Sequence, residues 1–231
     1  MRRLFLFLIA INIQLNSYSQ FHELGVFIGG ANYIGDVGAS YYVYPENVAL
    51  GLIYKWNMTT RYSLRASALF TEIKKSDYNP ADTNRFRRKY QFNNPIQELS
   101  VGIEINFVDF NLHGSDRKFA HYLYLGVSYF QHDLFYLDPS KLEPEEYDTT
   151  SNFALPIIVG VKTNLNAKTV VGFEIGARAT FTDNIDGSNP IGPFKNSTAL
   201  KFGNLNNNDW YVFTGLTISF TFGELPCYCK E

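Results

Sequence analysis

The stretch Glu98-Leu-Ser-Val-Gly-Ile-Glu-Ile-Asn-Phe107 has an apolar residue at every second position, with glutamates among the residues between them. Because side chains alternate between the two faces of a strand, one face here is apolar and the other carries charge. The last long segment repeats the pattern, with Leu216, Ile218 and Phe220 alternating with Thr and Ser. This arrangement suits a membrane barrel, which turns its apolar face to lipid and keeps a polar interior.

The first 19 residues have the pattern of a secretory signal peptide. Two arginines precede the apolar run 4–13, and Ser17 and Ser19 fit the −3 and −1 positions of a cleavage site before Gln20. A transmembrane anchor is the alternative, but it needs about 20 apolar residues, and this run is shorter. We therefore exclude residues 1–19 from the fold.

The remaining chain, 20–231, has the length of one domain. Aromatic residues make up 16% of the sequence, which favours strands and the interfacial girdles of membrane barrels. The net charge of −2 and the lack of a basic block argue against nucleic-acid binding. Cysteine occurs only at Cys227 and Cys229, too close to the C-terminus for a disulfide framework.

Alternating segments predict an all-β fold, a closed eight-stranded antiparallel transmembrane β-barrel of the outer membrane. The predicted strands lie near residues 21–33, 48–57, 61–73, 98–107, 121–132, 153–164, 169–182 and 209–222. Pro156 is unusual within such a strand, because proline lacks a backbone donor.

The connections between these strands alternate in length, as in barrels with periplasmic turns and extracellular loops. The short turns are 57–61 and 164–168, and the long loops are 34–47, 74–95, 133–152 and 183–208. Both chain ends and a C-terminal tail, 223–231, are therefore expected in the periplasm. The connection 108–120 falls on the same side and is longer than a turn requires, which suggests a contact with a partner.

Charged residues occupy the faces that should point into the barrel. These residues are Glu23, Lys55, Arg65, Glu98, Glu104, Lys162, Glu174 and Arg178. An unpaired buried charge is costly, and the interior of an eight-stranded barrel is just wide enough for side chains to fill it. We therefore predict a plug of paired charges with no conductance. A catalytic acid or a proton relay is the alternative.

No catalytic, cofactor-binding or metal-binding motif stands out, and the sequence predicts a protein that is not an enzyme. His132 and Asp133 form the best polar pair at the extracellular rim, where an enzyme would keep its catalytic groups. Adjacent residues on a strand point to opposite faces, which argues against a dyad. The two cysteines have no Cys or His partners for zinc.

Several segments, in their order along the chain, resemble the PorG-like outer-membrane barrels of the type IX secretion system of Bacteroidota. The segments are 22–30, 32–36, 53–57, 98–104, 107–113, 117–119, 209–215 and the Cys-Tyr-Cys tail within 222–229. The resemblance implies a role beside the periplasmic ring made by a lipoprotein and its partner. That role is linked to protein export and often to gliding motility.

The ring proteins and outer-membrane lipids are thus the expected partners. The residues expected to contact the ring are Arg117, Lys118, Cys227, Tyr228 and Cys229. In the periplasm, which is oxidising, the two cysteines could close a small ring or bond a partner chain. Two other functions remain open: an outer-membrane enzyme, such as a protease or a lipid-modifying barrel, and an adhesin or envelope-stabilising barrel.

Overall fold

The computed structural model describes residues 21–38, 41–78, 83–111, 118–138, 141, 143–166 and 168–223. The strands are β1 (Phe21–Ile34), β2 (Asn47–Asn57), β3 (Tyr62–Ser76), β4 (Gln91–Asn106), β5 (Phe119–Asp138), β6 (Glu143–Asn166), β7 (Thr169–Thr180) and β8 (Trp210–Phe222). Helix α2 (Thr83–Arg88) and the 3-10 turns η1 (Gly192–Phe194) and η2 (Thr198–Leu200) lie in the connections. No helix among these residues is long and apolar enough to cross a membrane.

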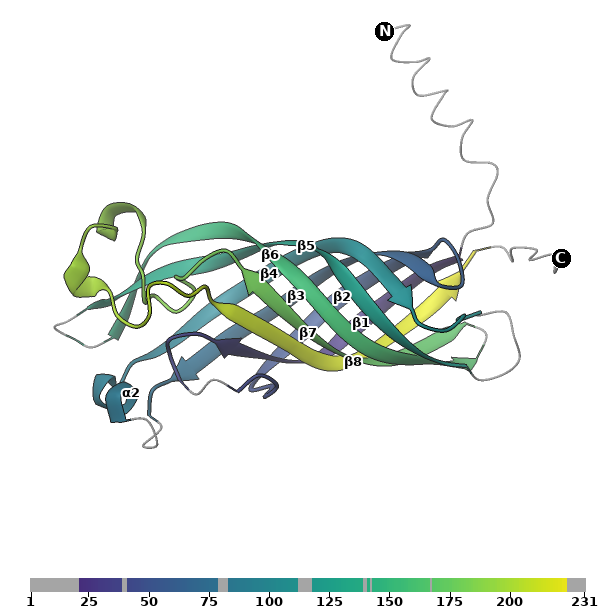
Figure 1. The fold of residues 1–231 in the computed structure, drawn as a ribbon, viewed down its shortest axis with the longest axis horizontal. Coiled ribbons are helices and arrows are strands. Elements are labelled where there is room, and N and C mark those ends of the chain that lie inside the picture. Colours follow the sequence, from purple (N-terminus) through teal and green to yellow (C-terminus); the bar gives the residue numbers. More distant parts are fainter. Residues whose placement is uncertain are drawn as a thin grey trace, which may run out of the picture.

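In the described part of the chain, eight strands form a closed barrel, each antiparallel to the next (Figure 1). β1 pairs with β8, with Val26 opposite Ile218, so the ring has no open strand edge. The predicted fold class is confirmed. His22 lies opposite Phe222, so the barrel begins and finishes at one end, which we call the terminal end. The opposite end, with the longer connections, is the loop end.

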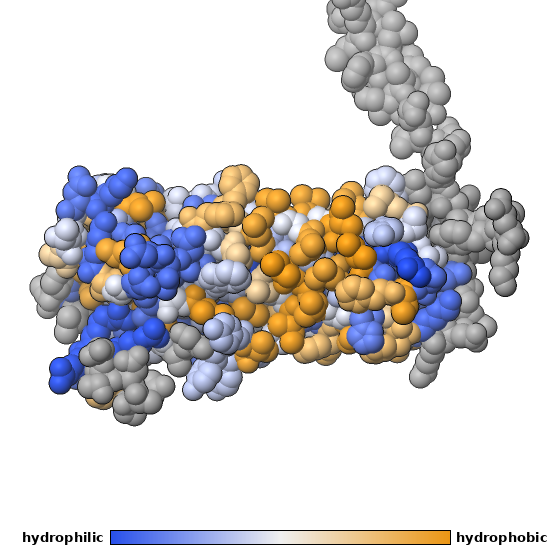
Figure 2. All heavy atoms as spheres, in the orientation of Figure 1, coloured by the Kyte–Doolittle hydropathy of each residue, from blue (hydrophilic) through white to orange (hydrophobic). Residues whose placement is uncertain are grey.

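The outside of the barrel carries an apolar band (Figure 2). Outward side chains such as Val101, Ile103, Phe173 and Leu216 are 41–59% exposed, although they are apolar. Their inward neighbours on the same strands are polar or small. This inside-out distribution is that of an outer-membrane β-barrel, whose outer face contacts lipid.

Aromatic side chains border the band at both ends. At the terminal end they are Tyr54, Tyr62, Phe107, Phe119 and Phe222, and at the loop end Phe70, Tyr129, Phe153, Phe181 and Trp210. The ten residue steps from Phe119 to Tyr129 cover about 34 Å along β5. At the ~40° tilt of such barrels this rise is about 26 Å, which matches the ~25 Å apolar band of outer-membrane barrels.

Strand pairing extends into two of the predicted long loops. The β3–β4 ladder continues to Ser76 opposite Gln91, and the β5–β6 ladder to Asp138 opposite Glu143. The predicted loop 133–152 is therefore wrong over most of its length, and the predicted loop 74–95 is wrong at its two ends, 74–76 and 91–95. Beyond the apolar band the outward positions face water and are polar. The alternation of apolar residues consequently stops there while backbone pairing continues.

Pro156 lies inside β6 and faces Arg178 of β7. On its other side, the β5–β6 pairing stops at Ile157 and resumes at Ala154 in the same register. Proline offers no N–H for this ladder, which explains the local interruption. The strand therefore continues through Pro156 without a shift of register.

Aromatic rings fill the loop-end half of the interior. Tyr33 packs edge-on against Phe92 at 5.3 Å between ring centroids, and Phe130 against Tyr211 at 5.4 Å. Phe213 contacts Tyr211 in the same manner at 5.6 Å. All five side chains are buried in the main core cluster. This layer lies between the charged part of the lumen and the loop-end mouth.

Candidate functional site

Eight charged side chains, which we call the lumen charge network, occupy the barrel interior. They are Glu23, Lys55, Arg65, Glu98, Glu104, Lys162, Glu174 and Arg178. Each stands at an inward position of its strand, and each is only 0–4% exposed. Charges this deeply buried need partners, because an ion without a counter-ion is strongly destabilising away from water.

Glu104 lies at the centre of the terminal-end half of the network. Its carboxylate accepts hydrogen bonds from Lys162 at 2.5 Å and from Lys55 at 3.0 Å. Arg65 approaches the same carboxylate at 3.6 Å but binds Glu174 with two parallel contacts of 2.8 Å. Such two-point arginine–carboxylate contacts are among the strong ion pairs in proteins. The four strands β2, β3, β4 and β6 thus meet around one glutamate, and Arg65 carries the contact to β7.

Arg178 and Glu98 form a second group nearer the loop end. Arg178 Nη2 lies 3.2 Å from Glu98 Oε1, and Tyr211 donates a hydrogen bond of 2.6 Å to the other oxygen. The partner of Arg178 is therefore on β4, across the lumen, and not Glu174 on its own strand. Glu23 is held by neutral donors, Asn57 at 2.7 Å and Ser219 at 2.9 Å.

Phenol groups complete the network, and the sequence analysis missed them. Tyr122 donates to Glu174 at 2.6 Å, as Tyr211 does to Glu98. The Lys55 ammonium lies 5.2 Å from the Tyr122 ring centre, and the Arg178 guanidinium 4.5 Å from that of Phe213. Side-chain alternation along the strands could have revealed them, because Tyr122 and Tyr211 occupy inward positions, as the charged residues on neighbouring strands do.

Both mouths of the barrel are covered. At the terminal end, Phe110 is 6% exposed, its N–H donates to Thr60 O at 3.0 Å, and its ring lies 4.9 Å from Lys162 Nζ. At the loop end, residues 182–190, which we call the mouth loop, are almost entirely buried. Asn94 donates to Ile185 O at 2.7 Å and so fastens this loop to β4. The interior is thus filled along its axis by rings, paired charges and a cap at each mouth.

The terminal end contains one of the residues predicted to contact a partner. Lys118 donates its backbone N–H to Asn164 at 2.7 Å, which fixes the start of β5 against β6. Nearby, Arg61 and Asp109 form an exposed ion pair of 2.7 Å, and the hydrogen bond from Arg61 lowers the pKa of Asp109. The predicted signal peptide 1–19 and the residues Arg117, Cys227, Tyr228 and Cys229 lie outside the described residues.

His132 and Asp133 do not form a catalytic pair. His132 is 1% exposed, and its ring nitrogens contact the backbone oxygen of Asp133 and the side chain of Asn152. The Asp133 carboxylate instead accepts a hydrogen bond from Thr149 at 3.0 Å. The two side chains point to opposite faces of β5. Among the described residues, no group of three His, Cys, Asp or Glu side chains is arranged to hold a metal ion.

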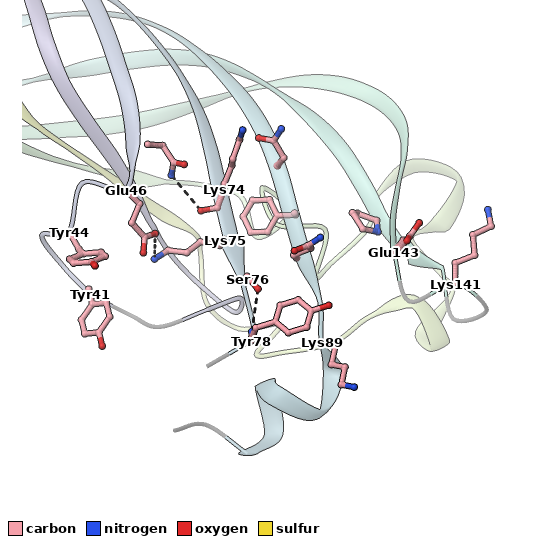
Figure 3. Close-up of a pocket in the computed structure, with 15 residues that line it drawn as sticks. Tyr41, Tyr44, Glu46, Lys74, Lys75, Ser76, Tyr78, Lys89, Lys141 and Glu143 are labelled. Atoms are coloured by element: carbon pink, nitrogen blue, oxygen red, sulfur yellow. Dashed lines mark hydrogen bonds and ion pairs between the residues drawn. The ribbon is translucent and has the colours of Figure 1, made fainter. Parts of the chain in front are cut away.

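An open groove of about 1100 Å³ lies at the loop end (Figure 3). It lies between the segment before β2, the hairpin of β3 and β4, and the tip of the β5–β6 hairpin. Its lining residues are Tyr41, Tyr44, Glu46, Asn47, Lys74, Lys75, Ser76, Tyr78, Lys89, Gln91, Phe92, Asn93, Lys141, Glu143 and Pro144. Sequence reasoning missed this groove, because its lining comes from segments that approach one another only in the folded barrel.

Carboxyl groups gather in and beside the mouth loop. Asp186 and Asp209 are at most 1% exposed, and Asp183 is half-buried. No ion pair reaches these three within the part of the chain that the structure describes. Burial, followed by repulsion from Asp186 and Asp36, raises the pKa of Asp183 to about 7. Burial also raises the pKa of Asp186 and of Asp209.

The mouth loop should therefore open more readily as the pH rises. A carboxyl whose pKa is higher in the folded state holds its proton there after the unfolded chain has lost it, so the folded state loses stability with rising pH. For Asp183 this window runs from about pH 4, the pKa of an unfolded aspartate, to about pH 7. Amide hydrogen exchange of residues 182–190, corrected for the intrinsic rate, should be several-fold faster at pH 8 than at pH 5.

Substitution of Asp183→Asn should reduce this pH dependence, whereas Asp148→Asn in the exposed β5–β6 hairpin should leave it unchanged. Protection of the mouth loop that is the same at both pH values in the unmodified protein would contradict the assignment.

Solved structures with a similar fold include small outer-membrane barrels. The attachment invasion locus protein Ail of Yersinia pestis, solved with the heparin analogue sucrose octasulfate, is 10% identical, with 89% of this chain and 100% of Ail covered and a TM-score of 0.48. The N-terminal barrel domain of Pseudomonas aeruginosa OprF is 11% identical, with 87% and 97% covered and a TM-score of 0.43. OprG of Pseudomonas aeruginosa is 10% identical, with 90% of this chain and 98% of OprG covered and a TM-score of 0.42.

No curated protein matches the sequence. One family model does, over residues 2–231, which is nearly the entire chain. Its description is "Domain of unknown function (DUF6089)". The chain therefore belongs to the DUF6089 family.

Proposed function

We propose that this barrel is a non-enzymatic component of the type IX protein secretion machinery in the outer membrane, where it anchors or positions a periplasmic ring. The observation that carries the proposal is the filled interior with a cover at each mouth. Arg65 and Glu174 join opposite walls of the lumen, and Phe110 covers the terminal end. Such a barrel is suited to hold a partner at the membrane. The resemblance of the sequence to PorG-like barrels supplies the identity of that partner, and extends the role to gliding motility.

The terminal end is the side that we assign to the periplasm. Short turns and both strand ends gather there, as in other outer-membrane barrels, and the longer loops lie opposite. The signal peptide 1–19 would direct the chain across the inner membrane. The tail 223–231 and the segment 108–120 would then face the ring lipoprotein and its partner.

Charge and sulfur chemistry favour these two segments as the contact. Arg117 and Lys118 would supply steering charge for association. Tyr228 lies between Cys227 and Cys229, two thiols in an oxidising compartment, and either thiol can bond a partner chain there.

Deletion of 223–231 in intact cells tests this assignment, as does the variant Cys227→Ser with Cys229→Ser. Co-purification of the ring proteins and secretion of type IX cargo should both fall to the level of a strain without the barrel. The amount of barrel in the outer membrane should be unchanged.

Lys195→Gln, an exposed change at the loop end, is the matched control and should leave both readouts normal. Normal ring association and normal secretion after the tail deletion would contradict docking at this end.

A further inference from the structure

The loop-end groove lies just beyond the apolar band. Lys74, on the outward face of β3, lies four residues beyond Phe70 of the aromatic girdle. Four steps correspond to about 13 Å along the strand, or about 10 Å above the girdle at the ~40° tilt of such barrels. Lipid headgroups occupy this depth at a membrane surface. A ligand in the groove would therefore contact the headgroup layer next to the barrel.

Tyrosines supply exposed aromatic faces to the groove. Tyr41 and Tyr44 lie 5.3 Å apart between ring centroids and are 54% and 53% exposed, and Tyr78 is 53% exposed (Figure 3). A tyrosine ring presents an apolar face with a polar hydroxyl at its edge. The outward amides of Gln91 and Asn93 lie on the same groove wall. Flat rings next to amide groups suit a sugar, which has apolar C–H faces and a rim of hydroxyls.

Lysines outnumber acids in the groove lining, with four lysines to two glutamates. Lys75 is buried and committed to Glu46 at 2.6 Å. Lys74 pairs with Glu72 at 2.9 Å, but both side chains are more than half exposed. An exposed pair of this kind contributes little stability, so Lys74 can exchange its partner for a bound anion.

Lys89 follows helix α2 and has a positive φ of 51°, so the backbone itself turns at the edge of the groove. No ion pair joins Lys89 to another of the described residues, and its ammonium remains exposed. Two available lysines, Lys74 and Lys89, thus line the same groove as the tyrosines, one at each end of it (Figure 3). Ammonium groups bind phosphate through charge-assisted hydrogen bonds.

We propose that the loop-end groove binds the phosphorylated sugar headgroup of a glycolipid in the outer leaflet. The tyrosines and amides contact the sugar, and Lys74 and Lys89 contact phosphate groups at the two ends of the groove. Because the groove lies at the level of the lipid headgroups, it favours a lipid-anchored ligand over a free saccharide. The inference rests on the outward orientation of the loop end in the proposed function, but its test is a binding measurement that is independent of secretion.

The full mature barrel in phosphatidylethanolamine nanodiscs, titrated with purified lipopolysaccharide, provides the test. Lys74→Gln with Lys89→Gln should weaken binding about tenfold, equivalent to about 1.4 kcal/mol. Tyr41→Ala with Tyr44→Ala should weaken it to a similar extent. The matched control, Lys195→Gln with Lys201→Gln, removes the same charge at the loop end outside the groove and should bind normally. Far-UV circular dichroism checks that each variant is folded.

Three comparison ligands test which chemical groups the groove recognises. Enzymatically dephosphorylated lipopolysaccharide should bind the unmodified protein about as weakly as intact lipopolysaccharide binds the lysine double variant. Phosphatidylglycerol and inorganic phosphate should compete poorly, because they lack the sugar. Unchanged affinity in both groove variants, an equal loss in the control variant, or equal competition by phosphatidylglycerol would overturn the proposal.

Discussion

Replacement of Arg65 by methionine should lower the free energy of unfolding by about 3–5 kcal/mol. Arg65 is fully buried and binds both oxygens of Glu174 at 2.8 Å. Methionine fills much of the same volume but leaves the Glu174 carboxylate without its counter-ion in the lumen. The cost is mainly that of one unpaired buried charge. Denaturant unfolding in lipid vesicles, followed by the fluorescence of Trp56 and Trp210, measures it.

A double-mutant cycle separates the charge from the packing. Arg65→Met combined with Glu174→Met removes both partners and should recover much of the lost stability, since replacing a whole buried ion pair by apolar groups is often neutral. A double variant as unstable as the sum of the single variants would show that the pair contributes nothing specific.

Replacement of Glu104 by glutamine should be comparably destabilising, again by about 3–5 kcal/mol. Glu104 is fully buried and is the shared acceptor for Lys55 and Lys162. The amide keeps the size of the side chain but removes its charge. The eight members of the lumen charge network are balanced, four acids against four bases, so the variant has one cation in excess. The same unfolding measurement detects the loss.

The compensating variant is Glu104→Gln with Lys162→Met, which restores the balance of charge. It should unfold at a denaturant concentration nearer to that of the unmodified protein. If Glu104→Gln alone unfolds like the unmodified protein, the lumen charges do not act as a paired network.

The sequence predicted the barrel because alternation is a local property. In the stretch from Glu98 to Phe107, lipid on one side and a polar lumen on the other constrain every residue. The strand extensions at the loop end, in the β3–β4 and β5–β6 hairpins, were missed because water faces their outer side. Outward residues there, such as Thr149 and Ser151, are polar and give no apolar alternation. Beyond the membrane, the strand pairs are stabilised by backbone hydrogen bonds and by contacts with the neighbouring hairpin.

The pairs within the lumen could not be read from the sequence. Charge on inward faces was visible, but the partner of each ion depends on how the strands are staggered around the ring. Arg178 binds Glu98, which lies 80 residues earlier in the chain. The mouth loop has no periodic pattern at all, so its burial depends on contacts with distant residues such as Tyr90 and Asn94.

The cross-lumen pairs also constrain how the barrel can assemble. Arg65 comes from β3 and Glu174 from β7, whereas Glu98 and Arg178 join β4 to β7. Adjacent strands alone do not bring these partners together. A partly formed sheet would therefore hold unmatched charges on its inner face, and the last seam, between β1 and β8, brings opposite walls together. Closure and neutralisation are consequently one cooperative event, and intermediates with an open seam should be scarce at equilibrium.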